Sequence, residues 1–201
     1  MDIIMRYFDT LSVDQTEKIR LYGALIADWN TRINLVSRKD VGNFLPKHVV
    51  QCLCISKIVQ FAPGTSVIDV GTGGGLPGIP LAIVNGGANF TLVDSIGKKV
   101  SAVDDMIKRL TLKHVRVKNA RVESVREQFD YVVARAVTNL SNFLKAVSGI
   151  CRRGTRIFYI RGNDFGNELR KMDNCNVYNM GALLDDDKFA DKVIIEICNG
   201  R

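Results

Sequence analysis

The glycine-rich stretch at residues 71–78 constrains this chain more than any other feature. It follows the short apolar run Ser66–Val70, in which Asp69 is the charged residue, and it precedes the apolar residues Leu81–Val84. This order is typical of a buried strand that turns directly into a helix. Glycines adopt positive φ without strain and carry no Cβ, so backbone N–H groups and the helix N-terminus can approach a ligand closely. The stretch therefore predicts a nucleotide-type ligand at the end of a strand, with a tight turn that binds nothing as the alternative.

One candidate ligand is a dinucleotide, whose fingerprint is G-x-G-x-x-G after a strand. Read from Gly71, the third position of the pattern is Leu76, which does not fit. Read from Gly73, the pattern is complete, but Pro77 then lies inside the turn that must hold the pyrophosphate. A dinucleotide-dependent dehydrogenase is therefore the least favoured function of this sequence.

The second candidate ligand is S-adenosylmethionine. Methyltransferases that use it carry an acidic residue followed by alternating glycines, and here Asp69, Gly71, Gly73 and Gly75 match that arrangement. Because this cofactor has no phosphate, an acidic strand end is favourable near its cationic methionine end, where it would repel a pyrophosphate. Asp94 ends the next apolar run, at a place where a carboxylate can accept hydrogen bonds from both ribose hydroxyls. The two features together favour S-adenosylmethionine.

Strands and helices alternate along most of the chain. The predicted strands are Ser66–Val70, Phe90–Val93, Val115–Lys118, Tyr131–Ala134 and Arg156–Ile160. Such alternation indicates a mostly parallel sheet with helices on both faces. A short helix is expected beyond Gly162, and the segments 177–180 and 193–198 are expected to add an antiparallel edge. The predicted fold is therefore α/β, a Rossmann-like methyltransferase core over residues 63–201 with a C-terminal antiparallel edge.

Residues 1–62 are predicted to form an N-terminal helical lobe packed on that core. Ser12 and Gln15 have the spacing of a capping box, and apolar residues recur at helical spacing from Tyr22 to Ile33. A second helix that contains His48 is expected to begin near Pro46, because proline is tolerated in a first helical turn.

The composition indicates in which compartment we expect the protein and with what kind of partner. An apolar run of about 18 residues and a signal-peptide pattern are both absent from the sequence, so we expect a soluble, cytoplasmic protein without a membrane partner. The five cysteines form no C-x-x-C pair, which favours reduced core thiols over a metal site.

The basic residues are concentrated in one part of the sequence. Residues 98–161 carry fifteen Lys and Arg but five Asp and Glu, whereas residues 1–97 carry eight of each kind. This basic excess indicates a polyanionic partner, with Lys98, Lys99, Arg121 and Arg161 among its candidate contacts.

The residues that follow the predicted strands supply the remaining site candidates, because ligands of open α/β sheets bind at the carboxyl ends of the strands. Glu123 is expected to accept from the adenine amine, with the backbone N–H of Val122 or Glu123 at a ring nitrogen. Arg135 is expected near the methionine carboxylate or a nucleic-acid phosphate; the alternative is an ion pair with Glu123 or Asp94. No side chain is obviously dedicated to proton abstraction. An acceptor with a free lone pair, such as guanine N7, needs only alignment and desolvation.

These residues together resemble the bacterial small-subunit (16S) ribosomal RNA guanine-N7 methyltransferases, also called glucose-inhibited division protein B. The resemblance covers nearly the whole chain. It is carried by Asp69–Ile83, Asp94–Lys99, Trp29-Asn30, Asn34-Leu35, His48, Arg121–Glu123 and Ala134–Ala136. Two positions depart from the family pattern: Gln51 stands where the family has an aspartate, and Arg161 where it has a lysine.

The resemblance implies methyl transfer from S-adenosylmethionine to the N7 atom of a guanine in small-subunit rRNA, free or in an assembling particle. By motif position, the cofactor contacts of the family fall on Gly71, Leu76, Val122, Glu123 and Arg135, with Asp94 as the ribose ligand. We expect a monomer. Two other functions stay open: a methyltransferase of the same fold that acts on a small molecule or protein, and a non-catalytic RNA-binding protein with a vestigial cofactor site.

Overall fold

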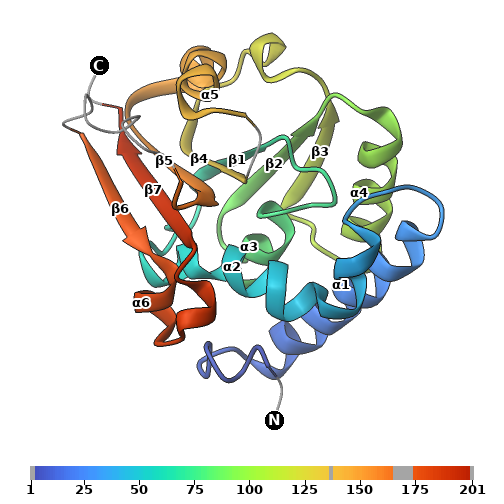
Figure 1. The fold of residues 1–201 in the computed structure, drawn as a ribbon. Coiled ribbons are helices and arrows are strands. Elements are labelled where there is room, and N and C mark those ends of the chain that lie inside the picture. The colour runs from blue at the N-terminus through green and yellow to red at the C-terminus, as the bar shows by residue number, and fades with distance from the viewer. Residues whose placement is uncertain (1–2, 136–137, 165–173, 200–201) are drawn as a thin grey trace.

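Seven strands form one mixed sheet at the centre of the protein (Figure 1). The computed structural model describes residues 3–135, 138–164 and 174–199. The strand order is β3-β2-β1-β4-β5-β7-β6; β1 to β5 run parallel, and β7 runs antiparallel to both β5 and β6. The strands are β1 Ser66–Val70, β2 Asn89–Asp94, β3 Val115–Asn119, β4 Phe129–Arg135, β5 Cys151–Gly162, β6 Cys175–Asn179 and β7 Lys192–Cys198.

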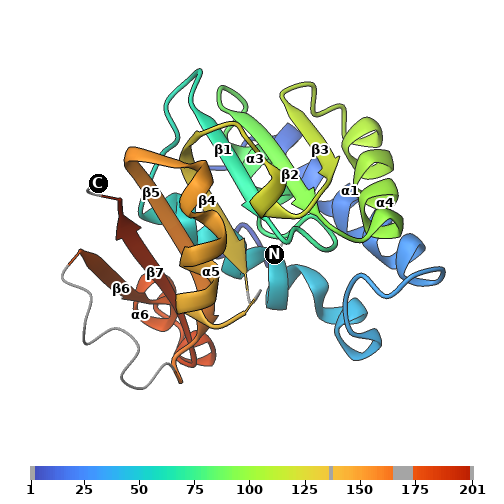
Figure 2. The same cartoon turned by 90° about the horizontal axis from the view of Figure 1, so that it is seen from above.

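Helices cover both faces of this sheet, as the alternation of elements predicts. They are α1 Val13–Asn30, α2 Val50–Leu53, α3 Gly78–Val84, α4 Gly97–Arg109, α5 Leu140–Val147 and α6 Met180–Leu184. Alternate strand residues point to opposite faces: Phe158 belongs to the apolar cluster that includes α1, α3 and α4, and Tyr159 to the cluster that includes α5. Figure 2 shows α5 and α1 on opposite sides of the sheet. The Rossmann-like fold class and the antiparallel C-terminal edge are confirmed.

The residues before β1 share the larger of the two apolar clusters with the sheet, to which α1 contributes Ile19, Tyr22 and Ile26. The predicted capping box is present: Gln15 N donates to Ser12 Oγ at 3.2 Å, and Ser12 N donates to Gln15 Oε1 at 2.9 Å. The assignment of residues 1–62 as a separate lobe stays a prediction.

Three elements differ from their predictions. The helix expected from Pro46 is not one continuous α-helix. It consists of a π-helical turn at Leu45–Val49, the α-helix α2, and a 3-10 turn at Cys54–Lys57. Strand β5 begins at Cys151 instead of Arg156, and its register with β4 shifts near Phe129. Helix α6, which has five residues, was not predicted from the sequence. The short helix expected beyond Gly162 coincides with residues 165–173, which lie outside the described residues.

Two expectations from composition can be compared with the described part of the chain. All five cysteines are reduced thiols, but the prediction of core thiols holds only for Cys52 and Cys54, whose burial raises their pKa values to about 11 and about 12. Cys151 and Cys175 are partly buried, and Cys198 is exposed at the last position of β7, where the strand leaves the packed core. Within the ranges that the structure describes, no helix is both long and apolar enough to cross a membrane.

Candidate functional site

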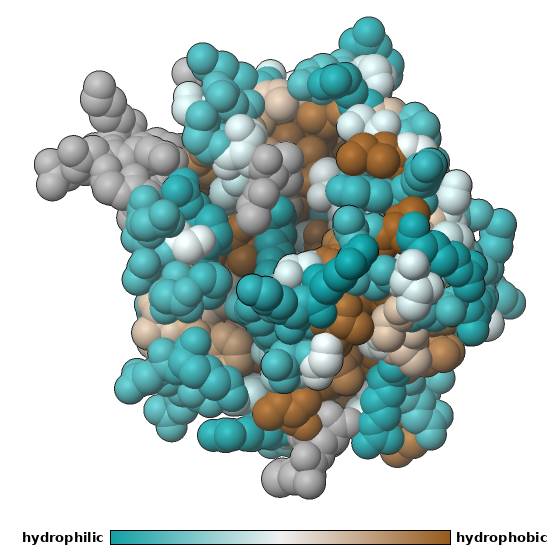
Figure 3. Space-filling model, turned by 45° about the vertical axis from the view of Figure 1, so that its right-hand side comes forward, coloured by the Kyte–Doolittle hydropathy of each residue, from teal (hydrophilic) through white to brown (hydrophobic). Residues whose placement is uncertain are grey.

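The strand order reverses between β1 and β4, and a cavity of about 440 Å³ lies at the carboxyl ends of the strands beside this point. The switch point of an open α/β sheet is where such folds bind nucleotides. Figure 3 shows a hollow near the top of one face of the molecule, with hydrophobic atoms at its floor and hydrophilic atoms around it. The lining residues of the cavity include Gly71, Asp94, Ile96, Lys99, Arg121, Val122, Glu123, Arg135, Asn142 and Phe143.

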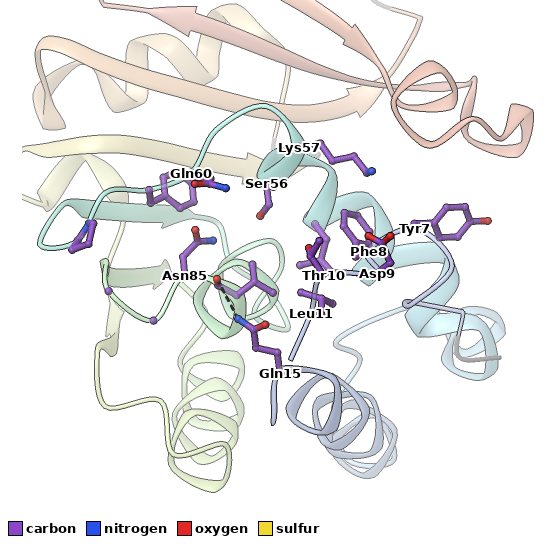
Figure 4. A pocket seen from close by; sticks show the side chains of 16 residues that line it. Tyr7, Phe8, Asp9, Thr10, Leu11, Gln15, Ser56, Lys57, Gln60 and Asn85 are labelled. Atoms are coloured by element: carbon purple, nitrogen blue, oxygen red, sulfur yellow. Dashed lines mark hydrogen bonds between the residues drawn. The ribbon is translucent and has the colours of Figure 1, made fainter. Parts of the chain in front are cut away.

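A second cavity, of about 580 Å³, lies at the amino ends of β1 and β2 (Figure 4). Its side chains come from the N-terminal segment, the 3-10 turn at Cys54–Lys57 and the end of α3, where Gln15 Nε2 donates to Val84 O at 3.4 Å. None of the predicted site residues lines it. The smaller cavity at the switch point is therefore the candidate functional site.

The glycine loop requires glycine at three positions. Gly71, Gly73 and Gly75 have φ values of 72°, 56° and 98°, a region that residues with a Cβ rarely adopt. Gly71 is exposed at the cavity, where the missing Cβ leaves the backbone accessible to a ligand. Gly73 and Gly75 do not line the cavity; they shape the turn.

Asp69 has a different role from the one expected. It is fully buried under the loop and does not line the cavity, so it cannot face the methionine end of a cofactor. Its Oδ2 atom accepts from Thr72 Oγ1 at 2.5 Å and from Gly78 N at 2.9 Å, and its Oδ1 atom has no hydrogen-bond partner among the described residues. Asp69 therefore holds the two ends of the glycine loop together. The expectation failed because a strand-end carboxylate can point either to the ligand or into the fold.

The burial of Asp69 predicts a pH-dependent stability. Burial raises the pKa of Asp69 from 3.8 to about 7, with a smaller contribution from the charge of Asp94. Between these pH values the unfolded chain has lost this proton and the folded chain keeps it, so the free energy of unfolding falls as the pH rises. Asp69→Asn keeps an acceptor and does not titrate. We expect the free energy of unfolding of this variant, measured in urea at pH 5 and pH 7.5, to fall less than that of the wild type, by roughly 1 kcal/mol or more.

The control for this experiment is Glu17→Gln, which removes an exposed carboxylate of α1. Its stability curve should follow that of the wild type. If Asp69→Asn and wild type lose stability in parallel between the two pH values, the buried carboxyl group is not the source of the effect.

Asp94 ties the loop to the second strand and also reaches the cavity. Gly73 N donates to its Oδ2 atom at 2.9 Å and Ile96 N to its Oδ1 atom at 2.9 Å. Each carboxylate oxygen has a second lone pair, so both can still accept from a ligand. Asp94 is 7% exposed, and it lines the cavity. The carboxylate is therefore held in a fixed orientation, which suits the binding of two neighbouring hydroxyls.

The walls of the cavity include apolar side chains that motif analysis did not assign to the site. Ile96 is 48% exposed, an unusual exposure for a large apolar residue, and Phe143 reaches the cavity from α5. Ile96 lies two residues after Asp94, which is the one sequence signal that could have identified it. An exposed isoleucine beside Val122 offers a surface on which a flat ring can pack.

Arg135 does not form the ion pair with Glu123 or Asp94 that was considered as its alternative role. Its Nη2 atom lies 2.6 Å from Nδ1 of His48, and its Nη1 atom donates to His48 O at 3.3 Å. A guanidinium group only donates, so Nδ1 accepts and the imidazole proton is on Nε2, which lies 3.4 Å from Oδ2 of Asp40. Burial and the charge of Arg135 lower the pKa of His48 to about 4, which keeps the ring neutral.

The structure brings together some of the predicted residues and separates others. Of the predicted cofactor residues, Gly71, Asp94, Val122, Glu123 and Arg135 line one cavity; Leu76 packs against the core instead. Of the predicted RNA contacts, Lys99 and Arg121 line the same cavity, and Lys98 is exposed on the first turn of α4. Arg161 lies at the end of β5 with a side chain that is 16% exposed, outside the residues that line the cavity.

The sequence is similar to a family of known proteins over most of its length. The sequence model of a family described as rRNA small subunit methyltransferase G matches residues 15–185. The protein named ribosomal RNA small subunit methyltransferase G of Flavobacterium johnsoniae is 36% identical over 98% of this chain and 97% of its own length. The protein of the same name in Porphyromonas gingivalis is 47% identical over 76% of this chain and 69% of its own.

Solved structures show similarity of fold alone. A 16S rRNA methyltransferase of T. thermophilus, in complex with AdoMet and guanosine, superimposes with a TM-score of 0.58 and 16% identity, over 84% of this chain and 44% of that one. A precorrin-6y methyltransferase of Geobacter metallireducens superimposes with a TM-score of 0.55 and 11% identity, over 84% of this chain and 92% of that one.

Proposed function

Since this chain belongs to the rRNA small subunit methyltransferase G family, we propose that it transfers a methyl group from S-adenosylmethionine to the N7 atom of a guanine in 16S rRNA. Methyl transfer to small-subunit rRNA follows from the family. The N7 atom as acceptor, the residues that bind each group and the monomeric state are the finer parts of the proposal. The cavity at the switch point is the observation that supports them.

The lining of the cavity fits the parts of S-adenosylmethionine. The carboxylate of Asp94 would accept from the ribose hydroxyls, and Glu123 from the adenine amine, with the backbone of Val122 at the ring. Ile96 would pack against the adenine, because it is the exposed apolar side chain beside these groups. Arg135, held by His48, would orient the methionine carboxylate. When bound, the cofactor supplies a methyl group on a positively charged sulfur; Gly71 would allow it to approach the loop closely.

The protonation states at the site support N7 as the acceptor. His48 accepts from Arg135, and Nε2 of His114, the other histidine of the sequence, lies 3.0 Å from Ala82 O at a distance from the cavity. Neither histidine is placed to take a proton from an acceptor. Guanine N7 carries a lone pair and no proton, so its methylation needs alignment and exclusion of water instead of a general base. The fixed positions of Asp94 and Arg135 would provide this alignment.

A ribosomal RNA substrate also implies that the enzyme acts in the cytoplasm, where bacterial ribosomes assemble. We propose that it acts as a monomer, because a single chain already supplies every residue assigned above to a part of the cofactor. Lys98, Lys99 and Arg121 lie at or beside this cavity and would contact phosphates near the target guanine.

The test of the proposed function is the transfer of labelled methyl from S-adenosylmethionine to 16S rRNA and to partly assembled small subunits. We expect the label on a single guanine. At that nucleotide the base should become sensitive to chemical reduction, and the RNA chain to cleavage, because N7 is methylated. The labelled nucleotide is then mapped by mass spectrometry. Label on another atom or base would disprove the N7 assignment. If no RNA form is labelled while calorimetry shows cofactor binding, the acceptor is a different class of molecule.

A further inference from the structure

The segment that leaves α1, residues 31–40, contacts the glycine loop from which Gly71 reaches the candidate site. Its first half is fixed to the glycine loop. Oδ1 of Asn30 accepts from Leu35 N at 2.8 Å and from Val36 N at 3.0 Å, which closes the turn. Leu35 then packs directly over Gly74, where an added Cβ would lie 3.3 Å from Cβ of Leu35 and 3.1 Å from Cδ1 of Ile26. Gly74 therefore allows the segment to lie close to the loop.

The second half of the segment ends near Arg135, where Nζ of Lys47 donates to Oδ1 of Asp40 at 2.5 Å. Oδ2 of Asp40 lies 3.4 Å from Nε2 of His48, and Nδ1 of His48 lies 2.6 Å from Nη2 of Arg135. Arg38 and Lys39 lie between these two attachments, and both side chains are exposed. Two exposed cations thus lie between a contact with the glycine loop and a contact with the His48–Arg135 pair.

Among the described residues, some cations have a carboxylate partner and others, such as Lys57, Lys113 and Arg153 away from the site, have none within 4.0 Å. Many cations away from the site have carboxylate partners: Lys108 pairs with Asp104, Arg116 and Lys118 with Glu127, Arg152 with Asp130, and Arg156 with Glu196. The cations near the site, as far as the structure describes their surroundings, have no carboxylate within 4.0 Å; they are Arg38, Lys39, Lys98, Lys99 and Arg121. Unpaired cations on a shared edge attract a polyanion more strongly than paired ones.

We propose that the segment 31–40 is an RNA-binding element, in which Arg38 and Lys39 bind phosphates of the rRNA strand that flanks the target nucleotide. This inference rests on the proposed function. Phosphate contacts of this kind fix the register of a nucleic acid without reading its sequence. Together with Lys98, Lys99 and Arg121, they would place cations on both sides of the glycine loop. The RNA backbone would then be bound on either side of the point where the target base enters the cavity.

The test compares two double variants with the same loss of charge. Arg38→Gln/Lys39→Gln removes the proposed contacts, and Lys113→Gln/Arg153→Gln removes two exposed cations near the amino ends of β3 and β5, at the opposite edge. The probe is a fragment of 16S rRNA, titrated at several salt concentrations. Direct RNA binding is measured separately from methyl transfer, and cofactor binding by calorimetry.

We expect the first variant to bind the RNA on the order of 10-fold more weakly at about 0.1 M salt, with a salt dependence reduced by the equivalent of one to two phosphates. Its affinity for S-adenosylmethionine should be unchanged, and the control variant should bind RNA like the wild type. The proposal is overturned if the first variant binds RNA normally, if both variants lose the same affinity, or if the first variant loses cofactor binding instead. Because RNA binding is scored directly, a failure of the wild type to methylate RNA would count against the proposed function and not against this surface.

Discussion

Asp94→Ala should abolish detectable binding of S-adenosylmethionine while the protein remains folded. The proposed contact consists of two hydrogen bonds from ribose hydroxyls to a carboxylate, and bonds to a charged group contribute about 1.5–3 kcal/mol each. Their loss corresponds to a decrease in affinity of at least about 100-fold. The substitution also leaves Gly73 N and Ile96 N without their acceptor, which adds a loss of order in the glycine loop. Calorimetry with the cofactor measures the affinity, and thermal unfolding measures the stability.

A second variant separates these two effects of Asp94. Asp94→Asn retains one acceptor oxygen for the loop but replaces the other by an amide that donates. We expect an unfolding temperature between those of the wild type and Asp94→Ala, because one of the two backbone N–H groups loses its acceptor, and a cofactor affinity that is still strongly reduced. Wild-type affinity in either variant would remove Asp94 from the cofactor site and leave it only its contacts to the loop.

Gly78→Ala should be among the most destabilising single substitutions in this chain. An added Cβ would lie 2.7 Å from Oδ2 and 3.0 Å from Cβ of Asp69, and 2.9 Å from Cγ of Leu92. All three atoms are buried in the packed core, so the helix must move away from the strands, and the hydrogen bond from Gly78 N to Asp69 is strained. Overpacking of this kind costs about 1–3 kcal/mol, and weakening of a buried hydrogen bond adds to that cost. Urea unfolding should show the loss, and methyl transfer should fall with it.

Gly86→Ala is the matched control for this substitution. Gly86 follows the same helix, α3, and an added Cβ there would meet no atom within 4 Å. Its unfolding free energy should change by less than about 0.5 kcal/mol. Equal stabilities for the two variants would show that the core around Asp69 and Leu92 adapts to an added methyl group more easily than its packing indicates.

The sequence by itself determined the fold class and which strand ends form the candidate site. Alternating apolar runs and helical segments are local patterns, and a strand that ends in a glycine-rich turn has few structural solutions. For this reason Gly71 and Asp94 could be assigned to one cavity before any contact was known. Glu123 and Arg135 followed from the rule that ligands bind at the carboxyl ends of parallel strands.

The tertiary structure decided where each side chain of these segments points. Asp69 turns into the fold and not toward a ligand, and Arg135 pairs with His48 and not with a carboxylate, because residues distant in sequence supply the partners. The same holds for the basic residues: the sequence showed an excess of positive charge after the loop, but their carboxylate partners depend on the folded surface. Arg38 and Lys39 belong to a part of the chain with no net charge, and only the packing of Leu35 on Gly74 brings their segment next to the glycine loop. Local patterns specify backbone elements, whereas the partners of a side chain depend on contacts between elements far apart in the chain.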